Sequence, residues 1–296
     1  MHVENEHGEA TVNGVRLHYV TAGPEDGLPL VLLHGFPQTW RIWRKVMPAL
    51  VAAGYRVVAP DLRGYGDSEK PAGQAGYDKG TMAADIHALV RHLGIGRFLL
   101  VGHDRGGRVA RRYALDYPDD LAGVALLDIL PVEYIYDRIT AGEVARKYWH
   151  WVFQLVPELP EQLIAGHEEA YLEAFFRRAP GLLDMLRADG VWDEYTRIWR
   201  DPAAVVAQLN DYRATYAVDV PRYRAEQAAG VKVRVPVLLL WGKQGNLQEY
   251  PVHDIWRAVA DDVHGESLDC GHYLPEEQPD AVVAHLLRFA AERFGN

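Results

Sequence analysis

The sequence predicts an α/β protein with a mostly parallel sheet flanked by helices and one inserted helical region. Three observations support this fold class. Short apolar runs alternate with longer stretches of helical spacing. Most of these runs are almost continuously apolar, which is typical of parallel strands covered on both faces. The alternation stops over residues 131–230, where helical patterns rich in Trp, Tyr and Arg replace it.

Six apolar runs are predicted to be strands, and two intervening stretches to be helices. The strands are 15–23, 29–35, 55–61, 98–104, 123–129 and 236–242, and the helices are 81–94 and 107–118. The second of these helices ends at a proline, which cannot continue a helix. Because strands return only after the helical stretch, we expect residues 1–130 and 231–296 to form one core, with residues 131–230 inserted as a helical cap.

The composition is that of a soluble globular protein. Its 296 residues are 49% apolar and 24% charged. The net charge of −10 argues against general affinity for nucleic acid or anionic membranes, and an anionic substrate would need local positive groups. The one cysteine, Cys270, excludes an internal disulfide and fits a reducing compartment. With neither a signal-peptide pattern nor an apolar run approaching ~18 residues, we expect a cytoplasmic protein.

The segment GHDRG, residues 102–106, joins a predicted strand to a predicted helix. It resembles the G-x-S-x-G turn of α/β-hydrolases, in which glycines permit a strained turn that exposes the central side chain. Asp104 stands where that turn has serine. An aspartate at a strand end can also simply cap the next helix. Within this glycine frame, we predict that Asp104 is a nucleophile.

Two further residues complete a candidate triad. Asp128 lies near the end of the run 123–129, directly after VALL, and His272 lies in LDCGHYLPEE, near the end of the chain. The order nucleophile, acid, histidine is the order that this fold requires. Asp128 taken alone has a structural interpretation. It is favoured as the acid because the other usual position, the loop WGKQGNLQEYP, contains no aspartate.

The tetrapeptide HGFP, residues 34–37, follows a predicted strand and resembles the loop that supplies one oxyanion-hole donor. We expect the backbone N–H groups of Phe36 and Arg105 to form that hole. A plain Gly-Pro turn is the alternative interpretation.

An aspartate nucleophile restricts the chemistry. Attack on an acyl carbon would give an anhydride, whereas attack on a saturated carbon with a leaving group gives an ordinary alkyl ester. A histidine can then activate water to hydrolyse that ester. The candidate bonds are therefore carbon–halogen bonds and epoxides.

Two arginines favour an anionic substrate. Arg105 and Arg108 are three residues apart, so both can face one pocket, and guanidinium groups suit a carboxylate. A neutral halide or epoxide has no use for two such charges. Arg111 and Arg112 are interpreted as surface residues. The predicted substrate is a small carboxylate with a leaving group on its α carbon.

Over nearly its whole length the chain resembles haloacetate dehalogenases of the fluoroacetate dehalogenase type. The matching segments are HGFPQTW, DLRGYGDS, GHDRGGRV, LLDILP, KYWHWVF, NDYRATY, LLLWG and GHYLPEE. HGFP and RGYGDS are shared with epoxide hydrolases. The resemblance implies Asp104 as nucleophile, His272 as base, Asp128 as its partner, and Arg105 and Arg108 as carboxylate ligands.

The resemblance also implies a halide pocket formed by His150, Trp151 and Tyr212, and a homodimer. It implies no cofactor, and the histidines lack the spacing of an HExxH metal site. Trp40 stands where many relatives have histidine, so we expect it to affect the shape of the pocket entrance.

Two other functions remain open. An epoxide hydrolase would use the same Asp and His with a pair of cap tyrosines, and Tyr148, Tyr212 and Tyr216 are available. The arginine pair argues against it. A non-catalytic small-ligand receptor on the same fold is disfavoured because the chain retains the candidate triad.

Overall fold

The computed structural model describes residues 5–295, which form an α/β fold around one eight-stranded sheet. The strand order is β1-β2-β4-β3-β5-β6-β7-β8, antiparallel from β1 to β4 and parallel from β4 to β8. The strands are β1 Glu6–Val12, β2 Val15–Ala22, β3 Pro29–Leu33, β4 Arg56–Pro60, β5 Phe98–His103, β6 Leu121–Leu127, β7 Val237–Gly242 and β8 Val263–Leu268. The predicted fold class is confirmed.

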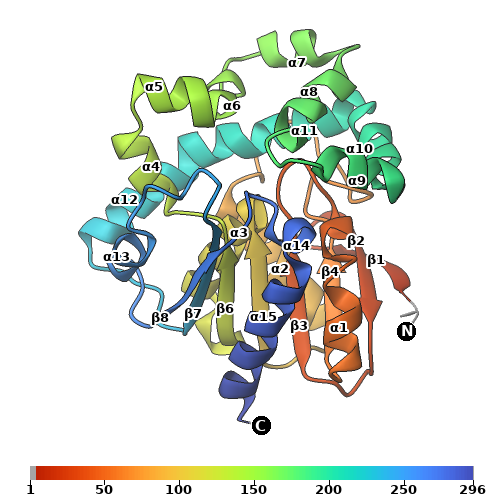
Figure 1. Cartoon of the computed structure of the whole chain (residues 1–296), viewed down its shortest axis with the longest axis vertical. Coiled ribbons are helices and arrows are strands. Elements are labelled where there is room, and N and C mark those ends of the chain that lie inside the picture. Colours follow the sequence, from red (N-terminus) through yellow and green to blue (C-terminus); the bar gives the residue numbers. More distant parts are fainter. Residues whose placement is uncertain (1–4, 296) are drawn as a thin grey trace.

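Helices cover both faces of this sheet (Figure 1). α2 and α3 lie on one face, and α1 and α15 on the other. Within β3, Val31 belongs to the first apolar cluster and Leu32 to the second, as alternation along a strand requires. The core helices are η1 Trp40–Trp43, α1 Met47–Ala52, α2 Lys79–His92, α3 Asp104–Asp116, η2 Pro118–Asp120, α13 Val252–Arg257, α14 Leu274–Glu277 and α15 Pro279–Phe294.

An inserted helical region, residues 141–228, follows α4 and lies over the end of the sheet from which α3 begins (Figure 1). The helices from β6 to β7 are α4 Val132–Arg138, α5 Ala141–Glu143, η3 Val144–Tyr148, α6 Trp149–Phe153, α7 Leu159–Ile164, α8 Glu168–Phe176, α9 Leu182–Ala188, α10 Val191–Trp199, α11 Pro202–Ala214, η4 Thr215–Asp219 and α12 Val220–Ala228. Among the described residues, no helix has both the length and the apolar content needed to cross a bilayer.

The two outermost strands, β1 and β8, were not predicted from sequence. In β1 the buried Ala10 and Val12 flank an exposed position, and in β8 half-buried positions alternate with the exposed His264 and Glu266. A search for continuous apolar runs finds strands covered on both faces and therefore misses edge strands of this kind. Of the remaining six strands, five lie within the predicted runs, and β6 overlaps the run 123–129 but begins two residues earlier, at Leu121.

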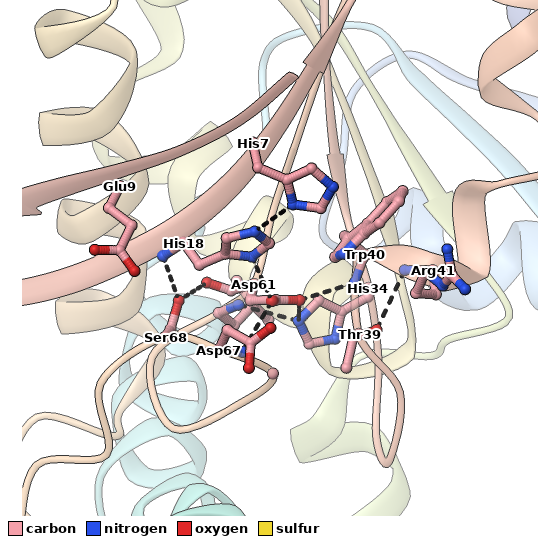
Figure 2. Close-up of polar contacts among 12 residues, drawn as sticks. His7, Glu9, His18, His34, Thr39, Trp40, Arg41, Asp61, Asp67 and Ser68 are labelled. Carbon is pink, nitrogen blue, oxygen red and sulfur yellow. Dashed lines mark hydrogen bonds and ion pairs between the residues drawn. The ribbon is translucent and has the colours of Figure 1, made fainter. Parts of the chain in front are cut away.

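Asp61, which follows β4, fixes the loop after β3 (Figure 2). His18 Nδ1 donates to its Oδ2 at 2.8 Å, and the Trp40 backbone N–H donates to its Oδ1 at 2.9 Å. The Asp67 N–H adds a second bond to Oδ2 at 3.1 Å. A buried carboxylate is stable when hydrogen-bonded in this way. The network therefore joins β2 and β4 to the segment 34–41.

The first turn of α3 lies directly against the chain after β3. A Cβ atom added to Gly106 would lie 2.3 Å from the His34 carbonyl oxygen. Only glycine permits this approach without displacing backbone.

We therefore expect Gly106→Ala to lower the free energy of unfolding by about 1–3 kcal/mol, because either α3 or the loop must shift. Gly96→Ala is the matched control, since a Cβ there would have no atom within 4 Å. Chemical denaturation of both variants measures the difference. Equal stability of the two variants would contradict the close approach.

Candidate active site

Asp104 occupies a strained turn between β5 and α3. Its φ is +46°, a left-handed conformation that is uncommon for a residue other than glycine. The Phe36 backbone N–H donates to Asp104 Oδ2 at 3.1 Å. Strain of this kind at a non-glycine residue is a feature of functional sites. The turn presents the Asp104 carboxylate above the sheet, with one oxygen fixed and the other available.

Asp128 and His272 lie near this carboxylate, Asp128 after β6 and His272 after β8, with β7 between these two strands in the sheet. His272 Nδ1 is 2.6 Å from Asp128 Oδ2, and the Gly242 backbone N–H donates to Asp128 Oδ1 at 2.9 Å. Asp128 also has a positive φ, of +52°. Because Asp128 accepts a hydrogen bond from the Nδ1–H group of His272, the Nε2 atom of the neutral ring carries no hydrogen and can accept a proton.

Burial and neighbouring charges shift the pKa values of three residues at the site. Burial alone would lower the pKa of His272, but the hydrogen bond and charge of Asp128 together raise it above 6.5. Burial alone would raise the pKa of Asp104, but nearby positive groups, His272 first among them, lower it. Burial lowers the pKa of His103 to about 3, so this ring stays neutral. Asp104 is therefore ionised at neutral pH, as a nucleophile must be.

A cavity of about 320 Å³ lies over Asp104 and separates the core from the inserted helices. It brings together eight residues predicted from sequence: Phe36, Asp104, Arg108, Asp128, His150, Trp151, Tyr212 and His272. The other residues lining it are Ile129, Leu130, Ile135, Arg146, Tyr148, Phe175, Arg178, Gln244, Gly245, Asn246, Leu247, Gly271 and Tyr273.

Arg105 is the one predicted site residue that does not line this cavity. Its guanidinium is buried in an ion pair with Asp211, and its Nη2 also donates to the Asp211 carbonyl at 3.0 Å. Lys79 binds the same carboxylate. The guanidinium carbon lies 4.1 Å from the centre of the Tyr212 ring, so Arg105 supports the wall of the cavity. A role for its guanidinium or backbone N–H in binding substrate stays a prediction.

Two other arginines of α3, Arg111 and Arg112, are buried in ion pairs. The interpretation of Arg111 and Arg112 as surface residues is wrong: both are at most 5% exposed. Arg111 pairs with Glu133, and Arg112 pairs with Asp116 and Glu226. Spacing along one helix could not reveal these partners, because two of the three belong to the distant helices α4 and α12.

Within residues 5–295, Arg108 alone of these buried arginines has no carboxylate partner. Its Nη1 donates to the Leu130 carbonyl at 3.2 Å, and its guanidinium lies over Trp151 at 4.9 Å. Its buried Nε has no hydrogen-bond partner. A buried cation with an unused donor is costly unless a ligand completes it.

The three residues of the predicted halide pocket all line the cavity. His150 and Tyr212 meet edge-to-face, with ring centres 5.9 Å apart. The buried His150 Nδ1 has no partner among the described residues. Burial and then the charge of Arg178 hold the pKa of His150 well below 6.5. His150 is therefore a neutral imidazole with one N–H to donate.

Sequence reasoning missed Arg146 and Arg178, which also line the cavity. Neither belongs to a motif, and only folding of the inserted region brings them to the site.

Trp40 is 4% exposed beside His7 and does not line the cavity, so the expectation that it shapes the pocket is not supported.

One group of side chains has the donor set of a metal site. Atoms of His18, Asp61 and Asp67 lie within 4.8 Å of one another, outside the cavity. Both oxygens of Asp61 already accept hydrogen bonds, so the group is explained as a structural network.

A family model described as "alpha/beta hydrolase fold" matches residues 29–279. The chain belongs to this family. It is 37% identical to the fluoroacetate dehalogenase of Burkholderia sp, covering 95% of this chain and 92% of that one. It is 38% identical to the soluble epoxide hydrolase of Corynebacterium sp. (strain C12), covering 98% and 99%. A crystal structure of a putative α/β-hydrolase from Nostoc sp PCC 7120 superimposes with a TM-score of 0.87 at 38% identity, covering 97% and 98%. The two named activities are equally close in sequence to this hydrolase.

The triad geometry predicts a pH response that can be measured without substrate. The negative charge of Asp128 raises the pKa of His272, so Asp128→Asn should lower it. NMR titration of the histidine-labelled protein checks this. Asp120→Asn, which removes a carboxylate bound to His87 instead, should leave the His272 titration in place. A His272 pKa that is the same in the wild type and Asp128→Asn would contradict the assigned pair.

Proposed function

We propose that this hydrolase removes halide from small 2-haloacids, converting fluoroacetate or another haloacetate to glycolate and halide. The observation that carries the proposal is Arg108, a buried cation beside Asp104 with no carboxylate partner among the described residues. A substrate carboxylate supplies that partner. A neutral epoxide would leave Arg108 uncompensated.

Charge balance supports this choice. A substrate carboxylate 4 Å from ionised Asp104 is repelled by about 4 kcal/mol at an effective dielectric constant of 20. A guanidinium at a similar distance offsets that repulsion and fixes orientation through paired N–H groups. Arg108 lies four residues, or one helical turn, after Asp104 in α3. It can therefore hold the substrate carboxylate while the α carbon of the substrate faces the nucleophile.

The first chemical step is a displacement. Because Phe36 N–H holds Asp104 Oδ2, the other oxygen attacks the α carbon of the substrate. A carbon–oxygen bond forms, the carbon–halogen bond breaks, and the halogen leaves with its electron pair. His150, Trp151 and Tyr212 line the same cavity and offer N–H and O–H donors to the departing halide.

The second step hydrolyses the ester on Asp104. His272 Nε2 takes a proton from water, and the resulting hydroxide attacks the Asp104 carboxyl carbon. The Phe36 N–H stabilises the oxyanion that forms. Collapse of this intermediate breaks the bond between that carbon and the glycolate oxygen, and His272 gives its proton to that oxygen. The Asp104 carboxyl group then loses its own proton to water. One oxygen of Asp104 thus leaves with glycolate and is replaced from water.

Epoxide hydrolysis is the second candidate, and one observation favours it. Tyr148 and Tyr212 both line the cavity, and the buried Tyr148 hydroxyl has no hydrogen-bond partner in residues 5–295. A pair of phenols can donate to an epoxide oxygen. Tyr216, in contrast, is 51% exposed and does not line the cavity.

Halide release separates the two candidates. Purified protein should release chloride from chloroacetate or fluoride from fluoroacetate. The same protein should form no diol from styrene oxide. Arg108→Gln should lower kcat/KM for chloroacetate about 100-fold or more, since a buried charged hydrogen-bond partner contributes about 1.5–3 kcal/mol and charge balance adds to it. Arg111→Gln is unsuitable as a control because Glu133 would lose its partner, so the exposed Arg257→Gln serves instead. Diol from styrene oxide without halide release would overturn the proposal.

An ester intermediate should accumulate when hydrolysis is blocked. His272→Asn retains the nucleophile but loses the base, so incubation with chloroacetate should add the mass of a carboxymethyl group to the intact protein. Asp104→Asn should show no added mass, because it lacks the attacking carboxylate. Mass spectrometry of peptides containing residue 104 locates the adduct. An unmodified His272→Asn protein would contradict the two-step mechanism.

A further inference from the structure

Two arginines of the inserted region reach the cavity without any acidic partner. Arg146 lies in η3 and Arg178 follows α8, so they come from segments about 30 residues apart in the chain. Both are exposed and both line the cavity that contains Asp104. Within the described residues, neither forms an ion pair, and the Arg178 guanidinium carbon lies 5.4 Å from the centre of the Phe175 ring.

This lack of partners is unusual for the inserted region. Its other arginines, within residues 141–228, each pair with an Asp or Glu. These pairs are Arg177–Glu173, Arg187–Glu173, Arg197–Asp67, Arg200–Glu169, Arg213–Glu161, Arg222–Asp116 and Arg224–Asp137. The two unpaired arginines are therefore the two at the cavity.

The positions of these charges matter because the background is unfavourable to an anion. The chain carries a net charge of −10, and the nucleophile Asp104 is itself an anion. Arg108 supplies one positive charge beside Asp104, whereas Asp104 and an anionic substrate together bring two negative charges. The charge of Arg178 does reach the site: after the larger effect of burial, it is the next cause of the lowered pKa of His150.

We propose that Arg146 and Arg178 form an anion-selecting entrance to the cavity, which captures small organic carboxylates and passes them to Arg108. The proposal rests on the proposed function, because it gives the anionic substrate of that reaction its route to Asp104. Positive groups at the mouth of a cleft raise the local concentration of an oppositely charged ligand and its rate of capture. Neutral halides and epoxides gain nothing from them.

Charge-neutral substitutions test the entrance. Arg146→Gln/Arg178→Gln should lower kcat/KM for chloroacetate about tenfold at low ionic strength, with kcat changed less than twofold. The loss should shrink toward none as sodium sulfate raises the ionic strength to about 1 M, where screening acts over about 3 Å. A merely structural role would lower kcat or the melting temperature and would not respond to salt in this way.

Arg177→Gln is the matched control. It removes one positive charge, as Arg178→Gln alone does, from the neighbouring position, but Arg177 pairs with Glu173 and does not line the cavity. Its kcat/KM should stay within twofold of the wild-type value at every salt concentration. An equal loss in Arg177→Gln and the double variant would overturn the proposal, because net charge alone would then explain it.

A binding measurement separates this proposal from the proposed function. Calorimetry compares glycolate with neutral glycolamide on the wild type, the double variant and Arg177→Gln. Glycolate affinity should fall about tenfold in the double variant only, and glycolamide affinity should not change. This result without halide release from the wild type would support the entrance and refute the dehalogenase. Glycolate binding that is undetectable, or equal in all three proteins, would refute the entrance whatever the activity.

Discussion

The site depends on the close contact between the first turn of α3 and the chain after β3. Gly106 allows α3 to approach His34, and the left-handed conformation of Asp104 turns its carboxylate toward the Phe36 N–H. The loop is held from its other side by Asp61, which binds the Trp40 N–H (Figure 2). The proposed nucleophile, Asp104, and the proposed oxyanion donor, the Phe36 N–H, are thus fixed by backbone packing. Such preorganisation is what electrostatic stabilisation of a transition state requires.

The sequence was informative where one segment carries the whole signal. Continuous apolar runs identified the strands covered on both faces, and the glycine frame around Asp104 identified the turn. The edge strands β1 and β8 escaped because their exposed positions are polar. Asp128 and His272 could be paired in advance, since strand ends in a parallel sheet meet at one edge and the alternative loop lacks aspartate.

Interactions between distant segments were harder to predict. The burial of Arg111 and Arg112 depends on Glu133 and Glu226, and no periodicity within α3 reveals a carboxylate supplied by another helix. The same applies to Arg105, whose partner Asp211 comes from α11. Helical spacing places side chains on one face of a helix, but the partner on the opposing element decides whether a guanidinium is structural or available. That distinction required the three-dimensional structure.

The arginines at the cavity differ in whether an acidic side chain neutralises them. Arg105, which is paired with Asp211, packs against Tyr212 in the wall of the cavity. The arginines that line the cavity itself, Arg108, Arg146 and Arg178, are the ones without a carboxylate partner among the described residues. A carboxylate nucleophile and a carboxylate substrate repel each other, so a fold that uses both needs positive charge that no internal acid neutralises. A hydrolase acting on a neutral epoxide has no such need, and a buried unpaired cation such as Arg108 would only lower its stability.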